Sequence, residues 1–187
     1  MLLAIDTSAG TSVALVDAGR VLAQADEPDT RGHAEAIGRL LERVLQDAGA
    51  APRDVTAVVS GMGPGPFTGL RVGIAAARAF AAGRGIPVHP VASHDAVAYG
   101  TTGELRVITD ARRREIAWTR YLDGEPVDGP HLAPADGTPV VARISAANLA
   151  LRAAQLLARG DDTGPAQPLY LRAPDITPSA GPKRVTG

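Results

Sequence analysis

The stretch GMGPGPFTGLRVG occupies residues 61–73, between a predicted strand and a predicted helix. Its glycines allow close backbone approach and positive φ angles, whereas Pro64 and Pro66 stiffen the loop. A strand-to-helix turn directs free N–H groups at whatever lies in front of it, which favours an anion. It is not a Walker P-loop, because no lysine follows the glycines to reach a phosphate. Anion binding, partner contact and a tight connection with Thr68 as N-cap are the competing interpretations.

Strand and helix patterns alternate on both sides of this loop and predict an α/β protein. Short apolar runs predict strands, and apolar positions repeating every three or four residues predict helices. The predicted strands are residues 2–5, 12–16, 20–25, 55–60, 86–91, 104–109, 115–121 and 169–171. The predicted helices are residues 33–48, 68–83 and 146–157, with a weak one over 93–99 and a loop over 126–139.

The second half of the chain repeats the pattern with which the first half begins. A strand ending in Asp110 is followed by a hairpin and a Gly-containing turn, as is the strand ending in Asp6. Internal duplication predicts two related lobes, with chance similarity between two hairpins as the alternative. We expect an N-terminal lobe over residues 1–100 and a smaller C-terminal lobe with a flexible tail over residues 101–187.

Composition excludes several kinds of site. The 187 residues include no cysteine, which excludes disulfides, thiolate zinc sites and a cysteine nucleophile. The four histidines contain no His-x-x-x-His pair of the kind that a helical metal site needs. A formal net charge of -1 gives no basic field, so we expect a partner to hold any RNA. No membrane span or signal sequence is predicted, and a cytoplasmic location is the expectation.

Two carboxylates stand at equivalent places in the two repeats. Asp6 is followed by Thr7 and Ser8 at the end of the first strand, and Asp110 ends the matching strand. Such an arrangement can hold Mg²⁺ through water and present backbone N–H groups to a phosphate. Two carboxylates facing one cleft would clamp a nucleotide. The alternative is that these residues serve as ordinary turn formers.

The helix that follows the glycine loop carries Gly69, Gly73, Ala76 and Phe80 along one stripe. Glycine lowers helix propensity, so repeated glycines in a helix indicate close approach of another backbone. A helix that is apolar on most sides is normally buried all round. We favour a partner helix as the covering element, with burial beneath the chain's own first helix as the alternative.

Four segments of the chain resemble the TsaB (YeaZ) family: residues 3–8, 33–35, 63–71 and 168–172. The resemblance spans most of the chain. It implies an α/β fold of the actin-like, Hsp70-like and sugar-kinase-like (ribonuclease-H-like) ATPase class, with two related lobes and the second reduced. Pro66 stands where the family usually has Ser, and the segment between residues 127 and 144 looks shorter than in the family. Both departures weaken a nucleotide site.

The resemblance implies a non-catalytic scaffold or activator that binds the larger paralogue TsaD. Their complex forms N6-threonylcarbamoyladenosine in tRNAs that read codons beginning with adenine. The family's TsaD members hold a metal with a His-x-x-x-His pair, and its absence here favours the TsaB side. No intrinsic cofactor is expected, since the complex uses ATP and Mg²⁺ near the partner interface. TsaE is a further expected partner, tRNA contact is expected to be indirect, and a homodimer is expected when TsaD is absent.

The implied pairing with TsaD uses the two helices at residues 33–48 and 68–83. No catalytic or metal-binding residue is expected, and Asp6, Thr7, Ser8 and Asp110 would form a vestigial nucleotide site. The alternative is a small ATP-binding phosphotransferase or ATPase that uses Asp6 and Asp110. A peptidase ranks last, because no nucleophile or metal constellation supports it. The predicted partner-binding residues are His33, Glu35, Ile37, Leu41, Gly69, Arg71, Val72, Gly73, Ala76 and Phe80.

Overall fold

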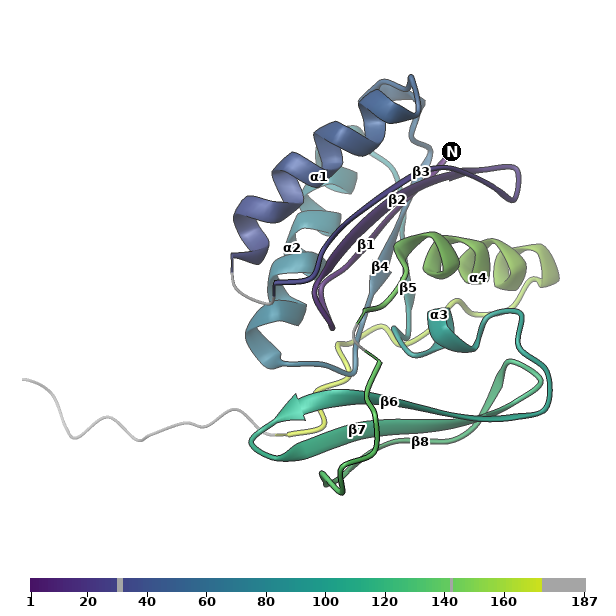
Figure 1. The fold of residues 1–187 in the computed structure, drawn as a ribbon. Helices are drawn as coiled ribbons and strands as arrows, with labels where there is room; N and C mark the ends of the chain where they lie inside the picture. Colours follow the sequence, from purple (N-terminus) through teal and green to yellow (C-terminus); the bar gives the residue numbers. More distant parts are fainter. Residues whose placement is uncertain (30–31, 142, 173–187) are drawn as a thin grey trace, which may run out of the picture.

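Two β-sheets organise the computed structural model, which describes residues 1–29, 32–141 and 143–172 (Figure 1). The first sheet has five strands in the order β3-β2-β1-β4-β5. Strands β1, β2 and β3 form an antiparallel meander, and β4 and β5 run parallel to β1. The tail expected over residues 173–187 lies outside the described residues. The strands are β1 (Leu2–Asp6), β2 (Thr11–Asp17), β3 (Arg20–Glu27), β4 (Ala57–Gly61) and β5 (Val88–Val91).

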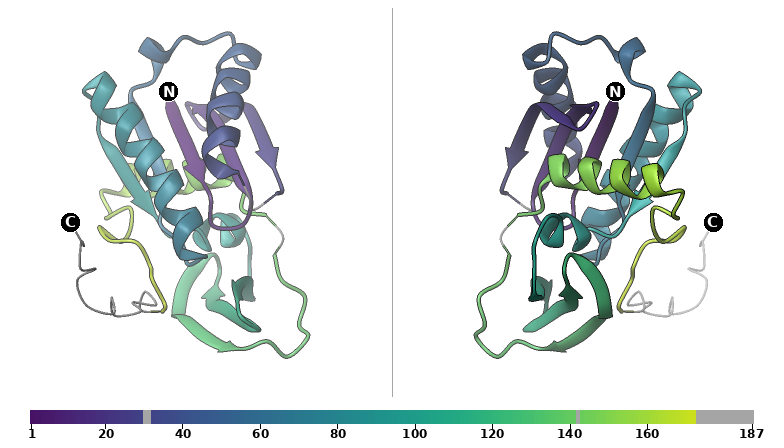
Figure 2. Two further views of the ribbon diagram at one scale, coloured as in Figure 1. Left: turned by 90° about the vertical axis from the view of Figure 1, so that its left-hand side faces the viewer. Right: turned by 90° about the vertical axis from the view of Figure 1, so that its right-hand side faces the viewer.

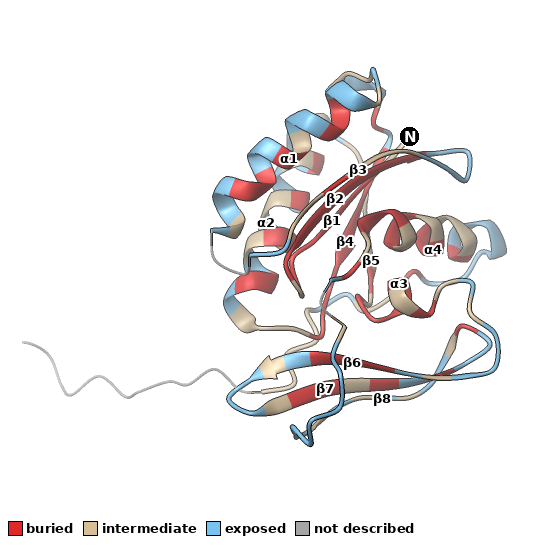
Figure 3. Cartoon of the chain, viewed as in Figure 1, coloured by how far each residue is buried: buried red, intermediate tan, exposed pale blue. Residues whose placement is uncertain are grey.

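Helices cover both faces of the first sheet (Figures 1 and 2). Helices α1 (His33–Asp47) and α2 (Phe67–Arg84) lie side by side on one face, and α4 (Ala146–Arg159) lies on the other. Successive side chains of a strand point to opposite faces, so Leu3 and Ile5 pack toward α1 and α2, whereas Ala4 packs toward α4. Burial on both faces explains the continuous apolar runs of these strands (Figure 3).

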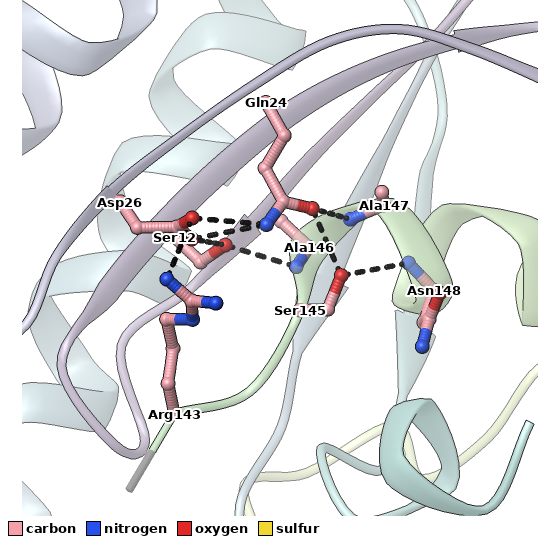
Figure 4. A network of polar contacts seen from close by, with 8 residues as sticks. All are labelled: Ser12, Gln24, Asp26, Arg143, Ser145, Ala146, Ala147 and Asn148. Carbon is pink, nitrogen blue, oxygen red and sulfur yellow. Dashed lines mark hydrogen bonds and ion pairs between the residues drawn. The ribbon is translucent and has the colours of Figure 1, made fainter.

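The amino end of α4 is fixed to the first sheet by a polar network (Figure 4). The Ser145 hydroxyl caps the helix by accepting a hydrogen bond from the Asn148 N–H at 3.3 Å. The first two N–H groups of the helix donate to Ser12 Oγ at 3.0 Å and to Gln24 Oε1 at 3.1 Å. Ser12 in turn donates to Asp26 at 2.6 Å. Strands β2 and β3 therefore satisfy donors that a helix start leaves unpaired.

The second sheet is an antiparallel meander of β6 (Glu104–Arg112), β7 (Glu115–Leu122) and β8 (Glu125–Pro134). It repeats the β1-β2-β3 meander, without the parallel strands and the helix pair that complete the first sheet. This agrees with the predicted repeat and the reduced second lobe. A division at residue 100 stays a prediction, because α4 packs on the first sheet although it follows the second in sequence.

Buried polar contacts connect the second sheet to the short helix α3 (Asp95–Ala98). The His94 imidazole is fully buried and lies 2.7 Å from Thr119 Oγ1 and 2.9 Å from Thr109 Oγ1. Burial lowers the pKa of His94 to about 3, so the ring is neutral at physiological pH. The Tyr121 hydroxyl donates to Asp95 at 2.7 Å. These contacts fix β6 and β7 against α3.

The prediction of a loop over residues 126–139 is wrong in its first part, where β8 forms. Pro126, Gly129 and Pro130 interrupt the alternation that indicates a strand. The register against β7 shifts on both sides of Arg120, so the edge strand accommodates these residues as irregularities.

Two further local predictions are wrong. Helix α2 begins at Phe67 with Pro66 in the N-cap position, so Thr68 is not the N-cap. Residues 169–171 form no strand, because the Leu169 N–H donates to the Met62 carbonyl at 2.8 Å without a continuing ladder. Within the described parts of the chain, no helix is long and apolar enough to cross a membrane.

Candidate functional site

A sealed polar cluster, which we call the strand-end cluster, lies where β1, β4 and β5 end. It consists of Asp6, Ser8 and Ser93, with exposed fractions of 1%, 3% and 0%. The Asp6 carboxylate accepts hydrogen bonds from the Ser8 N–H at 2.8 Å and the Ser8 hydroxyl at 2.6 Å. It also accepts one from the Ser93 hydroxyl at 2.5 Å. Parallel strands bring their carboxyl ends to one edge, which explains why residues 87 positions apart meet here.

The glycine loop packs directly against this cluster. A Cβ atom at Gly61 would lie 1.9 Å from Asp6 Oδ2, and one at Gly65 would lie 2.9 Å from Ser8 Cα. The Gly63 N–H donates to Ser93 Oγ at 3.0 Å, and the Ser93 N–H donates to the Gly63 carbonyl at 2.7 Å. The close approach that these glycines permit is therefore to the chain's own β1–β2 turn.

The two carboxylates of the predicted nucleotide site have unlike surroundings. Burial raises the pKa of Asp6, against the opposing effect of the hydrogen bonds from Ser8 and Ser93. Its carboxylate faces hydrogen-bond donors of the chain itself and is almost fully buried. Asp110 is half exposed, accepts a hydrogen bond from the Arg112 N–H at 3.0 Å, and pairs with the Arg112 guanidinium at 3.7 Å.

Two cavities flank the glycine loop, and neither Asp6 nor Asp110 lines them. The first, of about 360 Å³, lies between the loop, the β6–β7 turn and residues 170–172. The second, of about 580 Å³, lies between the starts of α1 and α2. It gathers residues from both predicted sets, namely Thr7, Ser8, His33, Glu35, Gly69 and Val72.

His33 fixes the start of α1 to the strand ends. Its Nδ1 lies 2.7 Å from Thr11 Oγ1, and burial lowers the pKa of His33. A Cβ atom at Gly69 would lie 3.0 Å from His33 Nε2, so the imidazole also touches the start of α2. The ring therefore has a structural contact on each side.

The small-residue stripe of α2 faces inward at its two glycines. A Cβ atom at Gly73 would lie 2.2 Å from Thr7 Oγ1, and one at Gly69 would lie 2.9 Å from the Thr7 carbonyl oxygen. The Thr7 hydroxyl donates to the Gly69 carbonyl at 2.7 Å. The interpretation of these glycines as room for a partner helix is wrong, because the approaching backbone belongs to this chain. Ile37, another predicted partner-binding residue, is only 6% exposed and belongs to the core.

The outer face, as we call the solvent side of α1 and α2, carries a different set of small residues. Ala75, Ala79 and Ala82 are exposed along α2, next to exposed Arg71. On α1, exposed Gly38 lies one turn before half-buried Leu41. A Cβ atom at Gly38 would meet no described residue within 4 Å. Of the other predicted residues, Glu35 is exposed, whereas Val72, Ala76 and Phe80 are half-buried and pack against the core cluster under α1 and α2.

Sequence reasoning missed Ser93, Gly38 and the three alanines. Ser93 follows β5, and its place at the end of a parallel strand is the signal that could have found it. The alanines follow Arg71 at the four- and three-residue steps of one helix face, a spacing that sequence shows. Which face of α2 is covered depends on the rest of the fold.

A family model described as TsaD, tRNA N6-adenosine threonylcarbamoyltransferase, matches residues 21–135. The chain is 42% identical over 178 residues to an uncharacterized protein of Mycobacterium tuberculosis, covering 86% of this chain and 84% of that one. It is 36% identical over 130 residues to the tRNA threonylcarbamoyladenosine biosynthesis protein TsaB of Escherichia coli, covering 66% of this chain and 56% of that protein. A protein of that name from Bacillus subtilis is 32% identical over 119 residues, which are 62% of this chain and 52% of the relative.

The solved structure of YeaZ from Pseudomonas aeruginosa superposes with a TM-score of 0.74 at 27% identity, covering 91% of this chain and 99% of that one. Another structure from that organism, described as similar to peptidase YEAZ, gives a TM-score of 0.77 at 26% identity. It covers 91% of this chain and 99% of its own. The predicted fold class is thereby confirmed.

Proposed function

The chain belongs to the TsaB (YeaZ) family, and we propose from this premise that it is a non-catalytic scaffold or activator subunit that binds TsaD. Proteins of this family are named for tRNA threonylcarbamoyladenosine biosynthesis. The proposed complex would form N6-threonylcarbamoyladenosine in tRNAs that read codons beginning with adenine. The chain itself would supply a binding surface.

Gly38 is the observation that carries this proposal. Glycine in an exposed helix interior destabilises the helix by about 1 kcal/mol relative to alanine. No described residue requires a missing side chain there, since none would lie within 4 Å of a Cβ atom at Gly38. Close approach of another backbone would explain why this position is glycine, because small residues allow two helices to pack closely. The exposed alanines of α2 extend the small surface, and half-buried Leu41 and Phe80 add apolar area.

The strand-end cluster supports the non-catalytic part of the proposal. An ATPase or phosphotransferase built on Asp6 would need its carboxylate open to a metal-bound phosphate. Here that carboxylate is 1% exposed and accepts three hydrogen bonds from the chain. Asp110 is half exposed and pairs with Arg112 on the second sheet. We therefore place ATP and Mg²⁺ with the complex and assign no cofactor to this chain.

The outer face would also serve a second copy of this chain, and a further component is proposed for the complex. A homodimer through α1 and α2 would bury the outer face when TsaD is absent. We propose TsaE as a further subunit of the complex and TsaD as the main tRNA-binding component, in keeping with the net charge of -1. A cytoplasmic location follows from the tRNA substrate.

A single substitution tests the binding surface. Gly38→Arg places a long cation on the outer face, and we expect TsaD of the same organism to bind it at least about tenfold more weakly, as measured by calorimetry. The melting temperature should not fall, because the side chain points away from the described residues and arginine favours a helix more than glycine does. Ala158→Arg is the matched control, since Ala158 is exposed on α4 at the other face of the first sheet. Equal affinity of the Gly38 and Ala158 variants would overturn the proposal.

A further inference from the structure

The last described residues, 168–172, run between α2 and the second sheet. The Leu169 N–H donates to the Met62 carbonyl at 2.8 Å, and the Arg172 guanidinium pairs with Glu115 at the start of β7. Between them, the Tyr170 ring packs on a small buried cluster of Met62, Leu70 and Ile74. The segment therefore holds a fixed place beside the first half of α2.

Tyr170 forms a three-part stack with residues at the start of α2. Its ring centroid lies 4.7 Å from that of Phe67. The Arg71 guanidinium lies 3.8 Å above the Phe67 ring, and its Nε donates to the Tyr170 hydroxyl at 3.1 Å. Stacking on one face and a hydrogen bond at Nε both restrict the guanidinium.

Among the described residues, the stack leaves the terminal edge of the Arg71 guanidinium available. Arg71 is exposed, and among residues 1–29, 32–141 and 143–172 no carboxylate forms an ion pair with it. The two terminal nitrogens of an arginine match the two oxygens of a carboxylate in a bidentate pair. Arg71 also lies one turn before Ala75 on the outer face, so a partner seated there would reach it.

We propose that Tyr170 is a positioning residue for the TsaD interface, which holds Arg71 in the orientation that binds a carboxylate of the partner. This inference rests on the proposed function and deepens it. Residues of the late segment, 99 positions from Arg71 in sequence, thereby take part in an interface otherwise built from α1 and α2.

The physical reason is preorganisation. A free arginine side chain loses rotamer freedom when it binds, and that loss weakens the complex. An arginine already fixed by a ring and a hydroxyl loses less. Arginine and tyrosine are also the residue types that dominate interface energetics when they are packed and desolvated. Arg71 and Tyr170 thus form one anchor, whose parts should act together.

Calorimetric titration of the full chain with TsaD of the same organism tests this coupling. Tyr170→Phe removes only the hydroxyl, and we expect about fivefold weaker binding with an unchanged melting temperature. Arg71→Ala should weaken binding about 30-fold. In the Arg71→Ala background, Tyr170→Phe should have no further effect, because the hydroxyl acts through the guanidinium. Arg20→Ala is the matched control, since Arg20 is exposed at the start of β3 and lies outside the helix pair.

The outcomes separate the two proposals. Binding of the wild-type chain together with wild-type affinity of Tyr170→Phe would overturn the positioning role and leave the proposed function standing. Additive losses in the double variant would also overturn it, because the two side chains would then act independently. No binding of the wild-type chain to TsaD would overturn both. Loss of affinity on Tyr170→Phe that is absent in the Arg71→Ala background supports the inference.

Discussion

The inner and outer sides of the helix pair both carry small residues, for opposite reasons. On the inner side, Gly69 and Gly73 leave room for the Thr7 backbone and hydroxyl, since a Cβ atom would lie only 2.9 Å and 2.2 Å from them. On the outer side, a Cβ atom at Gly38 would have no atom of the described parts of the chain within 4 Å. The inner glycines are required by the fold of this chain. None of the described contacts requires the outer glycine, which is consistent with the partner contact proposed above.

The largest expected effect falls on the inner side. Gly73→Val would drive a branched side chain into Thr7, and we expect the free energy of unfolding to fall by about 3 kcal/mol or more. Urea denaturation measures the loss. Gly38→Val is the matched control, and its unfolding free energy should stay within about 0.5 kcal/mol of the wild type. Similar losses in the two variants would contradict the distinction between the inner and outer sides.

The strand-end cluster offers a second test, of intermediate size. Asp6→Ala removes the acceptor of the Ser8 and Ser93 hydroxyls, and we expect the free energy of unfolding to fall by about 2 kcal/mol. Asp110→Ala removes a half-exposed partner of Arg112 and should change stability by less than about 0.5 kcal/mol. The same denaturation experiment compares them.

The nucleotide alternative is tested with the same two proteins. MgATP should leave the melting temperature of the wild type unchanged, because the Asp6 carboxylate is sealed by the chain's own donors. A rise in melting temperature with MgATP that disappears in both Asp6→Ala and Asp110→Ala would instead favour an ATPase. That result would indicate that the strand-end cluster takes part in nucleotide binding.

Local pattern is sufficient for the strands of the first sheet, which are short apolar runs, and for the three long helices, in which small or apolar positions recur every three or four residues. It is insufficient for β8, because Pro126, Gly129 and Pro130 interrupt the alternation that indicates a strand. The strand forms nevertheless by pairing with β7. The stripe of α2 is evident from its spacing. The prediction that a partner covers it is wrong at Gly69 and Gly73, since periodicity shows that a face is small and cannot show what lies against it.

The contacts of the strand-end cluster and of Tyr170 also fall into two kinds, those that local sequence indicates and those that it does not. The Asp6–Ser8 contacts join neighbours in sequence, and the turn chemistry of Asp and Ser indicates them. Ser93 reaches Asp6 only because β5 lies beside β4 and β4 beside β1. Tyr170 reaches Arg71 across 99 positions. Partners that depend on the order of strands or on a returning segment leave no signal in the spacing of one sequence.

The smallest expected effect is that of a single methyl group at Gly38, on the outer face. Gly38→Ala adds one methyl group to an exposed helix interior, where alanine is favoured over glycine by up to about 1 kcal/mol. We therefore expect the isolated chain to become more stable by roughly 0.5 to 1 kcal/mol in urea denaturation. Binding to TsaD should weaken at the same time, because the methyl group occupies the space in which we place the partner backbone. If one methyl group raises the stability of the isolated chain and lowers its affinity for TsaD, the glycine is needed for the partner and not for the fold. A gain in stability with unchanged affinity would mean that TsaD does not approach α1 at this point.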